Sequence, residues 1–323
     1  MNNLPLKTLL LGFALAGTIT TAHAFPDRVV RLIVPFPPGG VTDVAARVIG
    51  QQLSTKWGQQ VLIENRPGAG GVIGVEAAMR SAPDGYTLLM ATNGEITINA
   101  AIFAKPKYDA QKDLLPIAMV STTPFVWSAN LNTGINSLAE LVAAAKAKPG
   151  ALSYSSAGIG SSSHMATEQF AAAAGIKLLH VPYRGGAPAA TALMSGDVPV
   201  SAVSLSSLLP VVDSGKVKLL AITSNKRSSL APDVPTVNET GALKDFQTAI
   251  WTALFAPVGT PQAIVSKIEA DVIEALKDPG LVERLEKAGA QVSGMPAAGL
   301  RVHIQHETDE LKRIANEANI RVE

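Results

Sequence analysis

The chain has 323 residues, of which 47% are apolar and 16% charged, and its formal net charge is +1. This length predicts two domains with substantial cores, and the near-neutral charge argues against a nucleic-acid-binding surface. The chain has no cysteine, which excludes disulfides, a thiolate nucleophile, cysteine metal sites and a lipid-modified cysteine anchor.

The first 24 residues have the pattern of a secretory signal peptide. Lys7 precedes an apolar run at residues 8–17, and Ala22-His23-Ala24 is a small-x-small cleavage pattern. The apolar run is shorter than the roughly 20 residues that a membrane anchor needs. We therefore expect export, cleavage after Ala24 and a mature chain that starts at Phe25.

The mature chain opens with a strand, a tight loop and a helix. The β-branched run at residues 29–34 predicts a buried strand, and the prolines and glycines at residues 35–40 end it. Apolar residues then recur at helical spacing up to Leu53, and Thr42 or Asp43 is expected to cap this helix. A glycine-lined helix N-terminus attracts anions because its free N–H groups point outward.

The same strand–loop–helix pattern recurs twice more. Strands are predicted at residues 61–65 and 87–91, and each ends in a glycine-containing loop, at residues 66–71 and 92–94. Repeated units of this kind imply a parallel sheet whose loops share one edge, where α/β proteins bind ligands.

The middle of the chain predicts a second α/β unit with its own loop cluster. Glycine- and serine-rich loops at residues 156–164 and 183–188 follow two of its strands. The predicted strands are residues 125–129, 152–155, 178–182, 198–203 and 218–223, and the predicted helices are residues 138–147, 165–174, 189–194 and 206–214.

The tail adds a strand at residues 249–256 and helices at residues 261–277, 279–288 and 297–318, which are expected to pack on the first unit. The chain then crosses between two lobes near residues 122–126 and 248–251, and two-crossing chains close on ligands by hinge bending. The predicted fold class is α/β with two lobes and a cleft between them. Lobe 1 is expected to comprise residues 25–124 and 251–323, and lobe 2 residues 125–250.

Motifs for common catalytic chemistry are missing from the sequence. There is no Gly-x-Ser-x-Gly elbow and no Walker loop, and Ile73 occupies the place of the third glycine of a dinucleotide fingerprint. His303, His306 and Glu307 have helical spacing for metal ligands, but a solvated polar face is the favoured interpretation. No cofactor and no metal are expected.

His164 is the strongest single candidate for catalysis, because it begins a helix after a glycine- and serine-rich turn. A general base needs a nucleophile and an orienting acid, and no neighbouring residue supplies both. A histidine that fills the helical turn or lines a cleft is therefore favoured. Asp43 and Asp197 are better interpreted as a helix cap and a turn residue, and Ser161 and Ser162 as residues that cap a helix.

Motifs along the whole mature chain resemble one family. They are residues 35–43 (PFPPGGVTD), 65–74 (NRPGAGGVIG), 83–89 (PDGYTLL), 158–164 (GIGSSSH), 181–186 (VPYRGG), 232–236 (PDVPT) and 256–261 (APVGTP). In these features the chain is similar to the Bug (TctC) group of extracytoplasmic solute-binding proteins of tripartite tricarboxylate transport systems.

The resemblance implies a monomeric periplasmic two-lobed binder with no catalytic activity. It implies a small organic acid as ligand, held by backbone N–H groups, hydroxyls and water, and delivery of that ligand to the membrane subunits of a tripartite tricarboxylate transporter. The residues carried over as ligand-binding are Phe36, Pro38, Gly39, Gly40, Thr42, Asp43, Thr92 and Asn93 in lobe 1, and Ala157, Gly158, Gly160, Ser161, Ser162, His164, Tyr183 and Ser204 in lobe 2.

Two departures from the family pattern bear on the ligand. Ser204 stands where the family often has an acidic residue, and Glu95 where small residues or histidine are common. The ligand thus stays open among di- or tricarboxylates, acidic amino acids and aromatic acids. Two other functions stay in view, a ligand-presenting sensor for a membrane kinase and an α/β enzyme that uses His164 or Asp43.

Overall fold

One strand, β4 (Leu114–Asn130), passes through both lobes of the molecule. Its first part pairs with β9 (Ala249–Pro257), and its second part pairs with β7 (Val200–Ser204). The change of partner falls between Pro124 and Phe125. Because both parts belong to one continuous strand, a single sheet extends through the two lobes.

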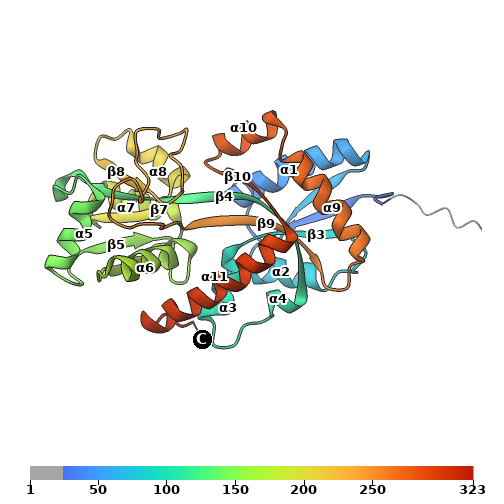
Figure 1. Ribbon diagram of the computed structural model, residues 1–323, viewed down its shortest axis with the longest axis horizontal. Coiled ribbons are helices and arrows are strands. Elements are labelled where there is room, and N and C mark those ends of the chain that lie inside the picture. The colour runs from blue at the N-terminus through green and yellow to red at the C-terminus, as the bar shows by residue number, and fades with distance from the viewer. Residues whose placement is uncertain (1–24, 323) are drawn as a thin grey trace, which may run out of the picture.

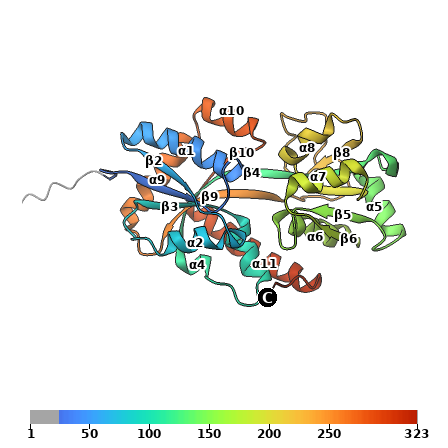
Figure 2. The ribbon, with the colours of Figure 1, turned by 180° about the vertical axis from the view of Figure 1, so that it is seen from behind.

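The computed structural model describes residues 25–322, so the expected signal peptide lies outside the described part of the chain. Figures 1 and 2 show two lobes side by side, with β4 and β9 crossing between them. We call the part that carries β1–β3, β9 and β10 lobe 1 and the part that carries β5–β8 lobe 2. The predicted α/β architecture with two lobes and two crossings is confirmed, whereas the residue boundaries of the lobes stay a prediction.

Lobe 1 is a mixed sheet with helices on both faces. Strands β1, β2 and β3 are parallel, while β9 and β10 run antiparallel to their neighbours. Helices α1, α9 and α10 cover one face through a core that includes Leu32 and Leu254, and α2 and α11 cover the other through a core that includes Ile33 and Trp251. The bounds are β1 (Val30–Val34), α1 (Val41–Trp57), β2 (Val61–Asn65), α2 (Val72–Met79), β3 (Thr87–Thr92), α9 (Gln262–Ala275), α10 (Pro279–Lys287), β10 (Gln291–Pro296) and α11 (Ala297–Glu317).

Lobe 2 repeats this plan. Strands β5, β6 and β7 are parallel, and β8 is antiparallel to β4. Helices α5 and α6 pack around Trp127 and Tyr154, and helices α7 and α8 pack around Val126 and Val203. The bounds are α5 (Leu138–Ala147), β5 (Ser153–Ser156), α6 (Ser162–Ala174), β6 (Leu179–Pro182), α7 (Gly186–Ser195), α8 (Leu205–Val212) and β8 (Val217–Ile222).

Several elements were not predicted from the sequence. They are the first half of β4, the strand β10 and the run of short helices between β3 and β4. These short helices are the π-helix η2 (Gly94–Ile98), α3 (Asn99–Ile102) and α4 (Ala110–Asp113), with two 3-10 turns elsewhere at η1 (Ala69–Gly71) and η3 (Leu131–Thr133).

The lobes also touch beside the crossing strands. Met165 on α6 of lobe 2 packs in one apolar cluster with Ile102 on α3 and Leu311 on α11 of lobe 1. At the start of α6, the Ser162 hydroxyl also bonds the side chain of Asn93, the residue that follows β3. Within residues 25–322, every helix is too short or too polar to cross a membrane.

Candidate functional site

The carboxyl ends of the parallel strands in the two lobes point toward each other. β9 runs from lobe 2 into lobe 1 and β3 is antiparallel to it, so β3 and its parallel neighbours β1 and β2 point toward lobe 2. β4 runs into lobe 2 and β7 is antiparallel to it, so β7, β5 and β6 point toward lobe 1. The loops after these strands therefore face one another between the lobes, as ligand-binding loops of α/β sheets do.

In lobe 1, the loop between β1 and α1 is fixed by Asp43. Its Oδ2 accepts hydrogen bonds from the backbone N–H of Gly39 and from Nε of Arg47, both at 2.9 Å. Its Oδ1 accepts one from the side-chain amide of Asn65 at the end of β2, at 2.9 Å, and the same amide donates to the carbonyl of Phe36 at 3.0 Å. Only 2% of Asp43 is exposed, so its carboxylate bonds to groups of the protein and not to solvent.

The expected capping role of Thr42 or Asp43 needs a correction. The N-cap residue of α1 is Gly40, which offers no side chain, and Asp43 reaches back from the first turn to Gly39 instead. Gly39 has φ +91°, a conformation that glycine adopts without strain. Burial raises the pKa of the Asp43 carboxyl, but the hydrogen bonds from Arg47, Gly39 and Asn65 outweigh burial and hold the pKa below its usual range.

The loop after β3 is built on the buried side chains of Thr92, Asn93 and Glu95. The backbone N–H and the hydroxyl of Thr92 both donate to Oε2 of Glu95 at 2.9 Å. Burial raises the pKa of Glu95 to about 7 despite these bonds. The Asn93 amide donates to the carbonyl of Ala249 at the start of β9, at 3.1 Å. Glu95 thus acts as an internal support of the loop, with 2% exposed.

In lobe 2, the loop from β5 into α6 holds itself together. Ser161 is the N-cap of α6, and its hydroxyl accepts from the His164 N–H and donates to the Gly158 carbonyl at 2.7 Å. The Ala157 N–H donates to the Ser163 hydroxyl at 2.9 Å, and the Gly160 N–H donates to Nδ1 of His164 at 3.1 Å. The predicted cap at Ser161 is confirmed.

His164 is a buried structural residue of this loop. Only 5% of it is exposed, and its ring stacks on His180 with centroids 3.8 Å apart. Because Nδ1 accepts from Gly160, the neutral ring carries its proton on Nε2. Burial, and next the charge of His180, lower the pKa of His164 to about 3, and burial lowers that of His180 to about 4. The interpretation of His164 as a residue that fills the helical turn fits this geometry.

The structure brings some of the predicted residues into direct contact and leaves others apart. Across the lobes, the Ser162 hydroxyl donates to Oδ1 of Asn93 at 3.1 Å. Within lobe 2, Tyr183 follows β6 and its N–H donates to the Ser156 carbonyl at 3.0 Å. Ser204 ends β7, and its hydroxyl pairs with those of Ser206 and Ser207. Phe36 is half-buried and Pro38 exposed on the lobe 1 loop.

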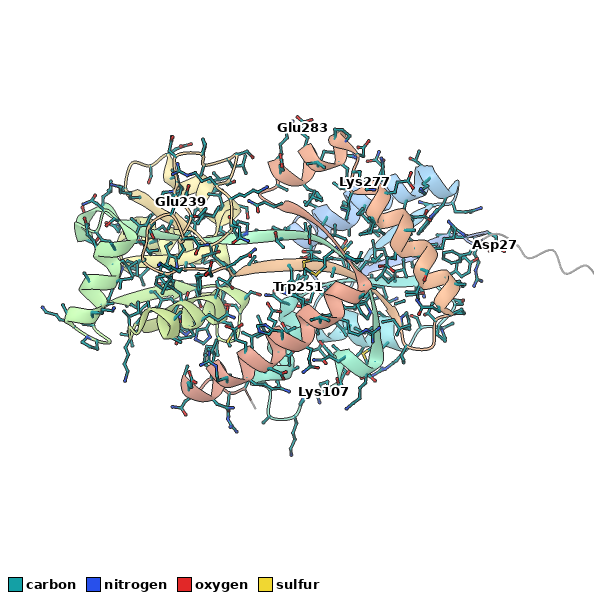
Figure 3. The ribbon with its side chains drawn as sticks, viewed as in Figure 1. Asp27, Lys107, Glu239, Trp251, Lys277 and Glu283 are labelled. Atoms are coloured by element: carbon teal, nitrogen blue, oxygen red, sulfur yellow. The ribbon has the colours of Figure 1, made fainter. Side chains whose placement is uncertain are left out.

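Sequence reasoning missed several residues that hold this site. Asn65 links two loops, and its position at the end of a strand was the available signal. Glu307 on α11 was expected on a solvated polar face, which is wrong: Trp251 and Thr97 both donate to its Oε2, at 2.8 and 2.7 Å. Burial raises the pKa of Glu307. Figure 3 shows Trp251 on β9 beside α11, in the middle of the molecule.

A cavity of about 870 Å³ lies between the lobes, and none of the residues predicted to bind the ligand lines it. Its lobe 1 wall includes Trp251 and Glu307, so it opens on the face of β9 that packs against α11, whereas the loop at Asp43 leads into α1 on the opposite face. We place the candidate site at the facing carboxyl edges, because the helix N-termini that attract anions begin there.

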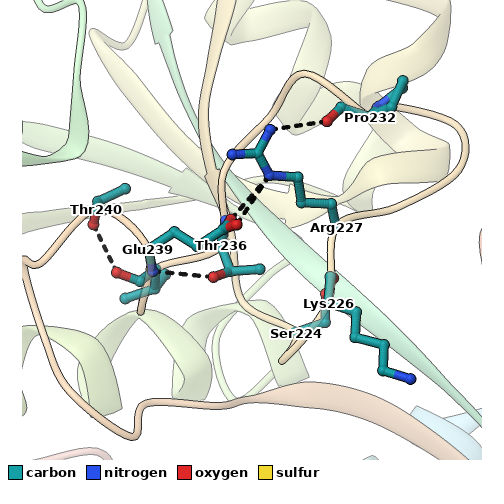
Figure 4. Close-up of polar contacts among 8 residues, drawn as sticks. Ser224, Lys226, Arg227, Pro232, Thr236, Glu239 and Thr240 are labelled. Atoms are coloured by element: carbon teal, nitrogen blue, oxygen red, sulfur yellow. Dashed lines mark hydrogen bonds and ion pairs between the residues drawn. The ribbon is translucent and has the colours of Figure 1, made fainter.

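Part of the lobe 2 wall of the cavity is the segment at residues 225–229, which polar contacts tie to the loop that follows it (Figure 4). Arg227 donates from Nε to Glu239 at 3.0 Å and from Nη1 to the Pro232 carbonyl at 3.1 Å. Glu239 and Thr236 form a reciprocal pair, in which each backbone N–H donates to the other side chain. These residues use their polar groups to fix the loop.

Comparisons with known proteins agree on one family. Residues 45–320 match the family model of the tripartite tricarboxylate transporter family receptor, TctC. The chain is 37% identical over 271 residues to protein BugT of Bordetella pertussis, covering 84% of this chain and 83% of BugT.

Two similar solved structures contain dicarboxylates. One is a protein of R. palustris with adipate, with a TM-score of 0.78 and 32% identity, covering 92% of this chain and 99% of that one. The other is MatC from Rhodopseudomonas palustris with bound malate, with a TM-score of 0.74 and 33% identity, covering 90% of this chain and 99% of that one.

We predict that Asp43→Ala loosens the lobe 1 loop. The variant loses the acceptor of Gly39, Arg47 and Asn65, so the free energy of unfolding should fall by about 2–3 kcal/mol, as for loss of a buried charged acceptor. Chemical denaturation measures this change. Asp309→Ala, at an exposed position on α11, is the control and should change little. Equal stability of the two variants would show that Asp43 does not support the loop.

We also predict that His164 makes the protein sensitive to acid. Its folded-state pKa lies below the usual 6.5, so the unfolded chain takes up a proton first, and stability falls as pH drops from about 6.5 toward 3. His164→Asn keeps an acceptor near Nδ1 but does not titrate. Relative to the wild type, its melting temperature should rise as pH falls through this range.

Glu95 acts in the opposite direction, because its raised pKa makes stability fall as pH rises from about 4.5 to 7. Glu95 is present in both proteins, so the difference in melting temperature between His164→Asn and the wild type removes its contribution and leaves that of His164. A difference that stays constant between pH 7 and pH 4 would contradict the assignment.

Proposed function

The chain belongs to the tripartite tricarboxylate transporter receptor family (TctC), and from this premise we propose that it captures a small carboxylated metabolite in the periplasm for such a transporter. A similar solved structure is that of the periplasmic binding protein BugD, which is 32% identical to this chain. The bound molecule would pass to the membrane subunits of the transporter without being chemically changed.

The observation that carries the proposal is the meeting of helix N-termini at the facing strand edges. The N-cap residues are Gly40 of α1 in lobe 1 and Ser161 of α6 and Gly185 of α7 in lobe 2. Each of these helices follows the loop after a strand that points at the other lobe. Their first N–H groups have no partner within the helix and carry a partial positive charge. A carboxylate fits such positions without a cationic side chain.

The ligands of similar proteins support a carboxylate with two acidic ends. Adipate and malate, which occupy the two R. palustris structures, are both dicarboxylates. A ligand with two carboxylates suits this arrangement, because lobe 1 offers the N-terminus of α1 to one carboxylate and lobe 2 offers those of α6 and α7 to the other. Thr42 and Asn93 in lobe 1, and Ser161 and Ser162 in lobe 2, are the proposed polar contacts.

The proposed function requires that the protein is exported to the periplasm. The described part of the chain begins with Phe25, whose ring packs against Tyr86 at 5.1 Å and Trp57 at 6.0 Å. Cleavage after Ala24 would leave this aromatic residue at the mature N-terminus. Protein recovered from the periplasm should therefore give an N-terminal sequence that starts at Phe25, and a sequence that starts at Met1 would argue against cleavage.

We predict that a dicarboxylate that binds the folded protein stabilises it, and that the stabilisation grows with the concentration of the dicarboxylate. A ligand that binds only the folded state raises stability by about 2.7 kcal/mol at one hundred times its Kd. Melting temperatures should rise with increasing concentrations of at least one acid in a panel of di- and tricarboxylates, and the diamide of that acid should give no rise. The acid should be recovered unchanged by mass spectrometry after incubation.

The outcomes separate the possible failures. No stabilisation by any carboxylate in the panel would contradict the proposed ligand class. Stabilisation together with loss of the acid would indicate an enzyme. Deletion of the gene should abolish uptake of the identified acid, and intact uptake would contradict the role in transport.

A further inference from the structure

The hydroxyl of Thr97 has two oxygen neighbours and a single hydrogen. Its Oγ1 lies 3.0 Å from the backbone carbonyl oxygen of Asn93 and 2.7 Å from Oε2 of Glu307. Thr97 is fully buried, so its hydroxyl has no contact with bulk water. If Glu307 is ionised, both neighbours are hydrogen-bond acceptors, and the one hydrogen of Thr97 serves only one of them.

A proton on Oε2 of Glu307 removes this conflict. The carboxylic acid then donates to Oγ1 of Thr97, and the Thr97 hydroxyl donates to the carbonyl of Asn93. The same Oε2 still accepts from the indole of Trp251, whose Nε1 lies 2.8 Å away. All three contacts are therefore hydrogen bonds at the same time in the protonated form alone.

The surroundings of Glu307 also favour the neutral carboxyl. Burial raises the pKa of this group and outweighs the hydrogen bonds that lower it, and the charge of Glu310 raises the pKa further. Within residues 25–322, Glu307 forms no ion pair that would hold it ionised. Its side chain lines the cavity between the lobes, so it can exchange a proton with solvent there.

The other titratable groups around Glu307 come from few elements. Strands β4, β9 and β10 and helix α3 contain none. Helix α6, which packs on α11, carries His164 and Glu168, and both bond within lobe 2. The remaining groups are His303, His306 and Glu310 on α11, Glu95 on η2, Glu286 on α10, and Lys226, Arg227 and Asp245 on the lobe 2 wall of the cavity.

The residue at the end of this hydrogen-bond chain, Asn93, joins the two lobes. Its amide donates to the carbonyl of Ala249 on β9 at 3.1 Å, and its Oδ1 accepts from the Ser162 hydroxyl of lobe 2 at 3.1 Å. Thr97 holds its backbone carbonyl from the lobe 1 side. Asn93 is also one of the residues that we propose as polar contacts of the ligand.

We infer that Glu307 binds a proton on Oε2 in the folded protein and, through Thr97, positions Asn93 for ligand binding. Glu307 is a positioning residue, because it acts on the ligand-facing loop through Thr97. When the proton is lost at higher pH, the Thr97 hydroxyl turns to the carboxylate and its bond to the Asn93 carbonyl breaks. The effect on ligand binding rests on the proposed function, whereas the presence of the proton does not.

The proton is tested without ligand, by the indole N–H signals of the three tryptophans in heteronuclear NMR spectra. The Trp251 signal should shift with a midpoint above pH 4.5, the ordinary value for glutamate, because its acceptor Glu307 loses a proton. The shift should vanish in Glu307→Gln. A Trp251 signal that titrates at or below pH 4.5, or that still titrates in Glu307→Gln, would overturn the inference.

His303 requires a control variant of its own, because its ring contacts that of Trp251 with centroids 6.1 Å apart. Its titration could also shift the Trp251 signal. In His303→Asn the shift that belongs to Glu307 should persist with the same midpoint. Loss of the shift in this variant would assign the titration to His303 and contradict the role of Glu307.

Trp57 is a matched control in the same spectra. Its indole donates to Oδ2 of Asp271 at 2.7 Å, as that of Trp251 does to Glu307. Burial raises the pKa of Asp271, but the hydrogen bonds from Lys267 and Trp57 outweigh burial and hold the pKa below its usual range. The Trp57 signal should therefore stay constant over the pH range in which the Trp251 signal moves.

Ligand binding tests the positioning of Asn93, with succinate, malate and adipate as the probes in isothermal titration calorimetry. In the wild type, the Kd of the acid that binds should rise about fivefold as pH increases through the Trp251 transition, the worth of one hydrogen bond. Relative to the wild type, Glu307→Gln and Thr97→Val should lose this rise. Thr97→Val should still show the Trp251 transition, because the bond between Trp251 and Glu307 remains.

Failures of the two proposals look different, and melting temperatures establish that each variant folds. If none of the three acids binds at any pH, the proposed function and the positioning role both fail, while the Trp251 signal still decides whether Glu307 holds a proton. If an acid binds with the same pH dependence in the wild type, Glu307→Gln and Thr97→Val, the positioning role alone is overturned.

Discussion

The change of pairing partners along β4 is the constraint on which the rest of the molecule depends. Antiparallel pairing with β9 in lobe 1 and with β7 in lobe 2 gives the parallel strands of the two lobes opposite directions. Their carboxyl ends therefore meet between the lobes, and with them every loop of the candidate site. If either pairing were parallel, the loops of that lobe would lie on its far edge and no two-sided site would form.

The sequence predicts the parallel strands well and β4 poorly, for physical reasons. Short β-branched runs that end in glycine loops, such as the one before Pro35, are typical of buried parallel strands. β4 carries Pro116 and Pro124, which lack the N–H of a ladder and argue against a central strand. The structure accommodates Pro116 beside an irregularity in the β9 register, and Pro124 at the change of partner. At both positions the hydrogen-bond ladder between β4 and β9 is already interrupted, so the missing N–H of proline costs little.

The candidate site was predictable where function depends on the backbone and much less where it depends on buried side chains. Glycine-containing loops before helices predicted the ligand-facing loops of both lobes. Ser161 was identified as a cap because serine caps helices regardless of tertiary context. The role of Asp43 was recognised in outline, but its partner Asn65 is 22 positions away. Glu307 appeared to be a surface residue because its partners Trp251 and Thr97 come from distant elements. No local pattern encodes such contacts.

Asn93 shows how the site and the crossing strands depend on each other. Its amide bonds the first carbonyl of β9, its Oδ1 accepts from Ser162 of lobe 2, and its carbonyl accepts from Thr97. The Thr97 hydroxyl also lies 2.7 Å from Oε2 of Glu307, which accepts from the indole of Trp251 on β9. A movement of α6 relative to lobe 1 must therefore break the bond to Ser162 or move Asn93 against β9. Because buried polar groups are costly to leave unpaired, loss of the bond to Ser162 leaves Oδ1 of the buried Asn93 without this partner, and this cost holds the start of α6 against lobe 1.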